Sequence, residues 1–166
     1  MGEVPKHRVA NQPGDGVVTM AETINWRTDG VKVVRADTLR KVILEPSSAG
    51  RATAFDFRGG GGGETWIGTV TLQPHAKTGP HHHGRHEVVV YVAKGRAHIR
   101  WGERLEFEAE VSPGDFVYFA PYVPHQELNI ANETVDFVVV RSDKERIAVG
   151  LDIVPVECPE QVKSGW

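Results

Sequence analysis

Cysteine is almost absent from this sequence: Cys158 is the single one among 166 residues, which excludes a framework of internal disulfide bonds. A proline follows it near the C-terminus, and the sequence offers no identifiable base that could activate it as a nucleophile. We therefore interpret Cys158 as a structural or idle thiol. A chain with one thiol suits a reducing compartment, and we expect a cytoplasmic protein.

Long hydrophobic runs and an excess of basic charge are also lacking. No apolar stretch approaches the ~20 residues of a membrane-spanning helix, and the N-terminus has no apolar signal-peptide core. The 19 Lys and Arg residues are outnumbered by 22 Asp and Glu, which gives a net charge of −3. Nucleic-acid binding favours basic patches, so we expect neither a membrane nor a nucleic acid as partner.

What the sequence does contain is a series of short alternating apolar runs separated by Gly and Pro turns, with almost no helical period. The predicted strands are 31–35, 52–57, 64–72, 88–92, 96–101, 105–111, 116–119 and 135–140. Residues 36–44 fit either a strand or a helical turn, and 147–156 could add a last strand or pack across a partner subunit. This pattern favours an all-β antiparallel barrel or sandwich.

The length and composition fit one domain with flanking segments. We predict an extended N-terminal arm at 1–30, a barrel at 31–155 and a C-terminal tail at 156–166. The five glycines at 59–63 precede a predicted strand rather than a helix, so we interpret them as a loop and not as a phosphate-binding site. The glutamates at alternate positions of 105–111 are interpreted as a solvated face.

The most informative stretch is Gly79–Glu87, which holds four of the eight histidines and a glutamate. It leads directly into the predicted strand 88–92. Imidazole and carboxylate groups together are suitable ligands for a divalent first-row metal, with no thiolate required. The alternative is a solvated histidine-rich loop that binds metal only adventitiously.

Side chains alternate faces along an extended chain, so residues of equal parity share a side. If the segment is extended throughout, His81, His83 and Glu87 point the same way. His82 and His86 then point to the opposite face, where we expect surface or supporting roles rather than metal ligation.

A second segment, Pro113–Asn129, has a complementary organisation. It comprises a turn, an apolar strand, a proline-bracketed turn and then His125. A solvated histidine loop would not require a matching histidine after a strand and turn elsewhere. The pair of segments therefore favours a metal site with His125 as the fourth ligand.

The two segments resemble the two conserved motifs of the cupin superfamily. In the first, His81-x-His83 is followed after three residues by Glu87 and later by Gly95. In the second, Gly114 precedes His125 by eleven positions and Asn129 follows it by four. The resemblance spans about residues 66–140.

The chain departs from the family pattern at the glutamate. Seven residues separate Glu87 from Gly95 where the family has six, so counting back from Gly95 places the family glutamate on Val88. Parity and chemistry favour Glu87, because valine cannot bind a metal. In addition, Gly79 lies too close to His81, and Ala120 and Tyr122 replace a proline and a glycine of the second motif.

The resemblance implies a small RmlC-like jelly-roll barrel that pairs as a homodimer and takes a small-molecule ligand. It implies one divalent transition metal held by His81, His83, Glu87 and His125. Three imidazoles and one carboxylate suit Fe, Mn, Ni, Co or Zn without choosing among them. They also leave positions open for water or substrate, which is typical of catalytic metal sites.

The strand after the histidines supplies a candidate catalytic residue. Tyr91 shares the parity of the predicted ligands, which makes it a possible proton donor; the alternative is a core tyrosine that merely favours a strand. Further candidates for the pocket wall are Trp66, Trp101, Phe119, Tyr122 and Gln126. The expected function is an oxygenase, isomerase or lyase acting on a small organic molecule. The alternative is a non-catalytic barrel that binds or senses such a molecule.

Overall fold

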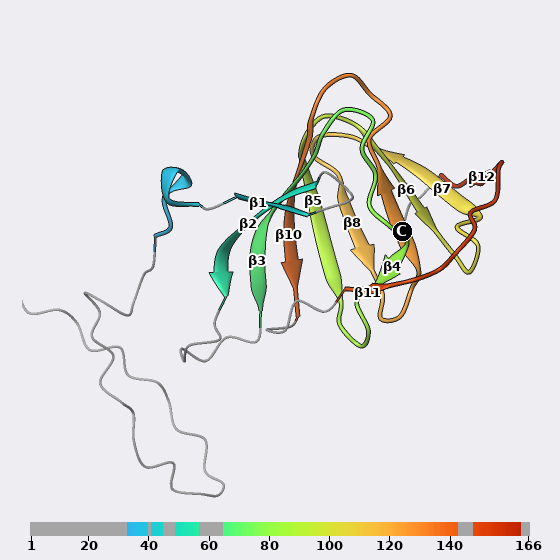
Figure 1. Cartoon of the computed structure of the whole chain (residues 1–166), viewed down its shortest axis with the longest axis horizontal. Coiled ribbons are helices and arrows are strands. Elements are labelled where there is room, and N and C mark those ends of the chain that lie inside the picture. Colours follow the sequence, from blue (N-terminus) through green and yellow to red (C-terminus); the bar gives the residue numbers. More distant parts are fainter. Residues whose placement is uncertain (1–32, 40, 45–48, 57–64, 143–147, 164–166) are drawn as a thin grey trace, which may run out of the picture. The chain divides into compact units, whose positions relative to one another are not determined.

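The described residues form twelve β-strands in two six-stranded sheets (Figure 1). This computed structural model describes residues 33–39, 41–44, 49–56, 65–142 and 148–163. The predicted N-terminal arm, 1–30, and the glycine run, 59–63, lie outside them. The division into arm, barrel and tail therefore stays a prediction.

The first sheet has the strand order β1-β2-β3-β10-β5-β8, with every neighbouring pair antiparallel. Its strands are β1 (Lys41–Leu44), β2 (Ala49–Asp56), β3 (Trp66–Leu72), β5 (Val88–Lys94), β8 (Phe116–Phe119) and β10 (Val135–Arg141). Figure 1 shows β2, β3, β10 and β5 side by side along one wall.

The second sheet has the order β11-β4-β9-β6-β7-β12. Its strands are β4 (His81–His82), β6 (Ala97–Trp101), β7 (Phe107–Val111), β9 (His125–Leu128), β11 (Val149–Gly150) and β12 (Glu160–Gln161). All pairs are antiparallel except β12 with β7, which is parallel.

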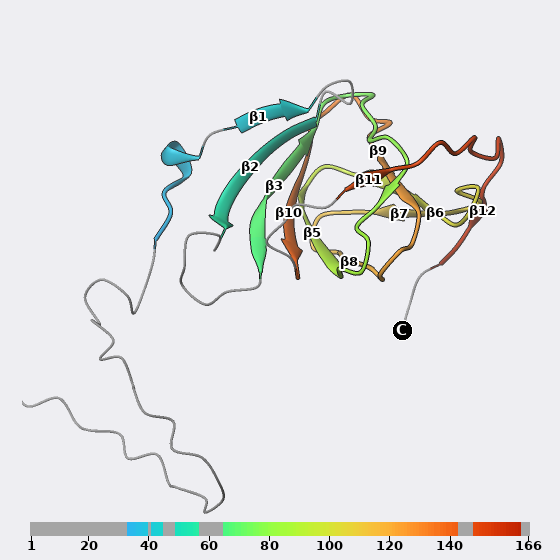
Figure 2. The same ribbon diagram turned by 60° about the horizontal axis from the view of Figure 1, so that its bottom comes forward.

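From β3 to β11 the chain passes repeatedly between the two sheets, so strands distant in sequence become neighbours (Figure 2). β3 pairs with β10 in the first sheet, and β4 pairs with β9 in the second. This interleaving is the topology of a jelly roll. The expected all-β jelly-roll barrel is confirmed.

Alternating side chains explain why these segments form facing sheets. In β10 every second residue from Val135 to Arg141 is buried, and in β5 Val88, Val90 and Val92 are buried while their neighbours are exposed. Phe137 lies opposite Val92 in this pairing and joins the same core. One apolar face of each sheet is thus removed from water against the other, which is the main stabilising contribution.

At the ends of the barrel the structure differs from the predictions made from the sequence. Residues 33–35 are not a strand. The segment 36–44, for which a strand and a helical turn were both predicted as alternatives, contains one of each: Ala36–Thr38 is a 3-10 turn and β1 follows. The segment 147–156 contributes β11, and the predicted tail contributes β12. No helix in the described part of the chain is long and apolar enough to cross a membrane.

The prediction of a solvated glutamate face on 105–111 is wrong for Glu108, which is 6% exposed. Its carboxylate accepts hydrogen bonds from His98 and Arg100 of the adjacent strand β6. Gln161 of β12 donates to the same carboxylate. The C-terminal strand therefore supplies part of this buried polar cluster, a contact that alternation along β7 cannot reveal.

Candidate metal centre

Three histidines converge where β4 lies beside β9. His81 of β4 is the cross-strand partner of His125 of β9, and His83 follows β4 directly. One nitrogen from each ring lies within 4.8 Å of those of the other two. The ring centroids are 4.4 Å apart for His81 and His125, and 4.9 Å apart for His81 and His83. This spacing allows all three rings to reach one ion.

Backbone contacts fix the tautomer of two of these rings. His81 Nδ1 lies 2.9 Å from the Gly79 carbonyl oxygen, and His125 Nδ1 lies 2.8 Å from that of Val123. A carbonyl oxygen only accepts, so each Nδ1 carries a proton, and in the neutral ring it is Nε2 that holds the lone pair. This is the arrangement in which a histidine binds a metal through Nε2.

His125 Nε2 is the atom of this group that lacks a partner in the described part of the chain. It is buried, and it has no hydrogen-bond partner among the described residues. The ring stacks on Phe119, with the centroids 3.9 Å apart and the planes at 19°. Burial lowers the pKa of His125, with a smaller contribution from His81, so the ring is neutral at pH 7. A neutral, orphaned nitrogen suits a metal ion.

Glu127 supplies the carboxylate at this site, and sequence reasoning did not assign it. It lies two residues after His125 in β9 and accepts a 2.6 Å hydrogen bond from the Thr78 hydroxyl. Burial raises the pKa of Glu127, but the adjacent His81 and His125 and the bond from Thr78 outweigh it. The net pKa is lowered, so the carboxylate is ionised at neutral pH. The i, i+2 spacing from His125 was the signal that could have found it.

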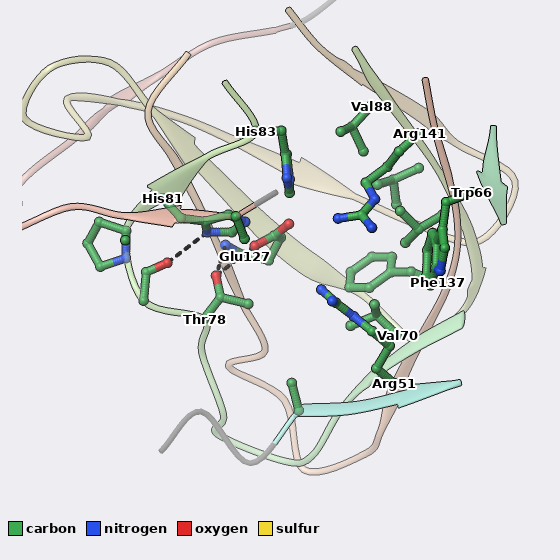
Figure 3. Close-up of a pocket in the computed structure, with 17 residues that line it drawn as sticks. Arg51, Trp66, Val70, Thr78, His81, His83, Val88, Glu127, Phe137 and Arg141 are labelled. Atoms are coloured by element: carbon green, nitrogen blue, oxygen red, sulfur yellow. Dashed lines mark hydrogen bonds between the residues drawn. The ribbon is translucent and has the colours of Figure 1, made fainter. Parts of the chain in front are cut away.

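The histidines open onto a cavity of about 270 Å³ (Figure 3). His81, His83 and Glu127 line one side of it. The first sheet supplies a largely apolar wall, formed by Trp66, Val70, Val88, Val90, Phe137 and Val139. Arg51 and Arg141 also reach into the cavity. The space is small, mostly apolar and polar at a few points, as is usual for ligand sites.

The structure does not bring Glu87 to the three histidines. The segment is not extended throughout, because Gly84 has a φ of 60° and the His86 N–H closes a turn onto the His83 carbonyl. The turn reverses the parity: Val88 lines the cavity, while Glu87 is exposed and accepts a 2.7 Å hydrogen bond from the Tyr118 hydroxyl. Counting back from Gly95, which places the family glutamate position on Val88, therefore identified the residue that faces the cavity better than parity did.

Tyr91 is likewise placed away from the histidines. It lies on the outer face of β5, is 36% exposed and contacts Phe116 with the ring centroids 4.9 Å apart. The same reversal of parity explains this position. The expectation that Tyr91 shares a face with the three histidines is therefore corrected.

The other predicted residues do not all line this cavity. Trp66 lines the cavity, whereas Trp101 lines a separate apolar cavity and Tyr122 is 63% exposed. Gln126 is buried, but its amide donates to the Thr78 carbonyl oxygen.

Neither of the remaining histidines of the segment joins the group of three. His82 accepts a 2.8 Å hydrogen bond from the Gly84 N–H, and its ring lies beside Tyr122. His86 is buried, and its Nδ1 lies 3.1 Å from the Ser142 carbonyl oxygen.

Comparison with known proteins agrees with this fold. A family model described as "Cupin domain" matches residues 68–141, which contain all three histidines and Glu127. Residues 68–141 are a cupin domain. A search of curated protein sequences finds no match.

Solved structures similar to the chain contain the same fold. A polyketide cyclase, RemF, from Streptomyces resistomycificus superposes with a TM-score of 0.63 at 21% identity, covering 78% of this chain and 89% of that one. A cupin-superfamily sugar phosphate isomerase from Silicibacter pomeroyi gives 0.57 at 23% identity, covering 74% and 83%. A cupin-2 domain protein from Rhodospirillum rubrum gives 0.59 at 20%, covering 76% and 81%. At these identities the likeness shows the fold alone.

Proposed function

We propose that this protein is a metal-dependent enzyme that acts on a small organic molecule, with His81, His83 and His125 as the metal ligands. The observation that carries the proposal is the buried, unsatisfied Nε2 of His125, aimed at the two other imidazoles beside a cavity. Iron, manganese, nickel, cobalt and zinc all accept three imidazoles. When bound, such an ion supplies a Lewis acid that polarises a substrate oxygen.

The number of ligands favours catalysis over a structural role. Structural sites are closed by four protein ligands, whereas catalytic sites typically use three and leave a position for water or substrate. In the described part of the chain the cluster contains three histidines and no further ligand within the same reach. The cavity beside it gives a small molecule access to that position.

Glu127 is the proposed proton acceptor. Its lowered pKa keeps it ionised at neutral pH, and Thr78 orients it from one side. A fixed carboxylate facing an apolar cavity can remove a proton from a carbon next to a polarised carbonyl group. Of the three expected reaction types, this arrangement favours an isomerase or lyase over an oxygenase.

The proposal has two separable tests. The first is elemental analysis of untagged wild-type protein, His125→Ala and, as control, His82→Ala. We expect about one equivalent of metal in the wild type and in His82→Ala, and almost none in His125→Ala. Equal metal in all three proteins contradicts the ligand assignment.

The second test follows proton transfer without knowledge of the product. Metal-loaded protein is incubated in deuterium oxide with a panel of small carbonyl compounds, and deuterium uptake is measured by mass spectrometry. Exchange is expected in the wild type and lost in Glu127→Gln with metal content unchanged. Metal binding without exchange on any compound would favour the alternative, a non-catalytic binding or sensing barrel.

Three broader features are also proposals. The chain acts as a homodimer in the cytoplasm, with an arm at 1–30 and a tail at 156–166 flanking the barrel at 31–155. Sedimentation of the purified protein tests the dimer directly.

A further inference from the structure

Two arginines occupy positions where the barrel pattern places core residues. Arg51 in β2 lies opposite Val70 of β3, and both line the cavity. Arg141 ends the buried row of β10, where it lies opposite Trp66 on one side and Val88 on the other. Arginine is among the residues least often buried, so two of them distinguish this wall of the cavity from an ordinary apolar core.

Trp66 holds both guanidinium groups. The Arg141 guanidinium carbon lies 4.5 Å from the centroid of the indole ring, and that of Arg51 lies 5.6 Å from it. Arg141 is only 1% exposed and Arg51 is half-buried. Stacking on a tryptophan offsets part of the cost of removing a guanidinium from water and fixes its plane.

The two arginines point across the cavity toward the metal centre. Figure 3 shows their guanidinium groups extending from the Trp66 side toward Glu127 and the histidines. Arginine stays protonated in proteins, so this wall carries two permanent positive charges. Planar guanidinium groups bind carboxylates through paired, charge-assisted hydrogen bonds.

We propose that the cavity binds a small organic acid, with its carboxylate between Arg51 and Arg141 and its reactive oxygen at the three histidines. This assignment rests on the proposed function and names its substrate class. The apolar residues between the two ends, among them Val90 and Phe137, would enclose a short hydrocarbon body. Glu127 then lies across the cavity from the carboxylate anchor, at the reacting end.

The cavity favours a carboxylate over a phosphate. Its volume of about 270 Å³ is below the roughly 300–1,000 Å³ of common ligand pockets, and most of its wall is apolar. A phosphate dianion presents three oxygens that each need donors.

The test is calorimetric titration of butyrate and benzoate into metal-free and zinc-loaded protein, with butyramide, benzamide and inorganic phosphate as comparison probes. The variants are Arg51→Met, Arg141→Met and, as matched control, Arg96→Met, whose side chain is 71% exposed. We expect carboxylates to bind the wild type and the control equally. Binding should weaken about tenfold or more in either cavity variant and for the amides.

Zinc content separates this proposal from the one it rests on. The arginine variants should retain zinc, whereas His125→Ala should lose zinc and still bind carboxylates in the metal-free assay. If zinc does not bind to any of the proteins but carboxylate binding depends on the two arginines, the metal-site proposal is contradicted and the acid-site proposal is supported. Carboxylate binding that persists in both arginine variants overturns the acid site and leaves the metal centre intact.

Three other results also overturn the acid site. They are tighter binding of phosphate than of the carboxylates, equal binding of acids and amides, and no binding of any acid at millimolar concentration. Circular dichroism confirms that each variant is folded. If Arg141→Met does not fold, Arg51→Met alone provides the test, because Arg51 is only half-buried.

Discussion

Two clusters of histidine and glutamate lie in the same sheet, and they differ in what their polar atoms contact. The first is the candidate metal centre, with His81, His83, His125 and the adjacent Glu127. The second, which we call the ion cluster, comprises His98, Arg100, Glu108 and Gln161. Both are at least partly shielded from water, and both combine imidazole with carboxylate.

The ion cluster is closed on itself. Glu108 Oε1 accepts from His98 at 2.9 Å and from Gln161 at 2.7 Å, while Oε2 accepts from Arg100 at 2.6 Å. The candidate metal centre is open, because the buried Nε2 of His125 has no hydrogen-bond partner among the described residues and the three rings converge beside a cavity. Residue type alone therefore does not mark a functional site; a group of converging imidazoles that includes a buried nitrogen without a partner, beside a cavity, does.

The largest expected difference between the clusters concerns metal affinity. His125→Ala should weaken metal binding by at least about a hundredfold, because loss of even a supporting partner costs about 10–100-fold. His98→Ala should leave affinity unchanged, since His98 belongs to the ion cluster. Competition with a chromogenic chelator measures both. Equal loss of metal affinity in the two variants would contradict the functional distinction between the two clusters.

For the free energy of unfolding we expect the opposite order, with the larger effect from substitutions in the ion cluster. Glu108→Gln leaves the Arg100 guanidinium without its countercharge and should lower the free energy of unfolding by about 2–3 kcal/mol. Glu110→Gln is the matched control, because its side chain is 51% exposed and its ion pairs are long, so the loss should stay below about 1 kcal/mol. Urea unfolding of the metal-free proteins provides the measurement.

Acid should weaken the ion cluster within a defined pH range. Burial raises the pKa of Glu108, but hydrogen bonds from Arg100, Gln161 and His98 outweigh it and lower the pKa from 4.5 to about 2. A depressed pKa contributes stability above pH 4.5, and this contribution of about 3 kcal/mol is lost as the pH falls toward 2. This part of the decline should be absent from Glu108→Gln; an identical pH profile in both proteins would contradict the assignment to Glu108.

The smallest effect is expected at Glu87, the sequence-predicted ligand that faces outward. Glu87→Gln should leave metal content unchanged, in contrast to His125→Ala. The hydrogen bond to Glu87 raises the pKa of the Tyr118 hydroxyl, so this pKa should fall toward its ordinary value in the variant. Phenolate absorbance during alkaline titration reports that shift. Loss of metal in Glu87→Gln would restore Glu87 as a ligand.

The sequence alone determined the jelly roll and the three histidines. Alternation in segments such as 88–92 and 135–140 specifies strands with one buried face, and this periodicity is local. The spacing of His81 and His83, with His125 after a strand and turn, placed these side chains in one site because the barrel makes β4 and β9 neighbours.

Only the tertiary structure decided which carboxylate accompanies the histidines. Parity along the chain selected Glu87 and Tyr91, but a single turn at Gly84 moved Val88 inward and both predicted residues outward. Glu127 and the two cavity arginines come from strands that meet only when the barrel closes. A period of two holds along a regular strand but does not carry through a turn such as the one at Gly84, so the faces of successive segments are set by contacts between the sheets.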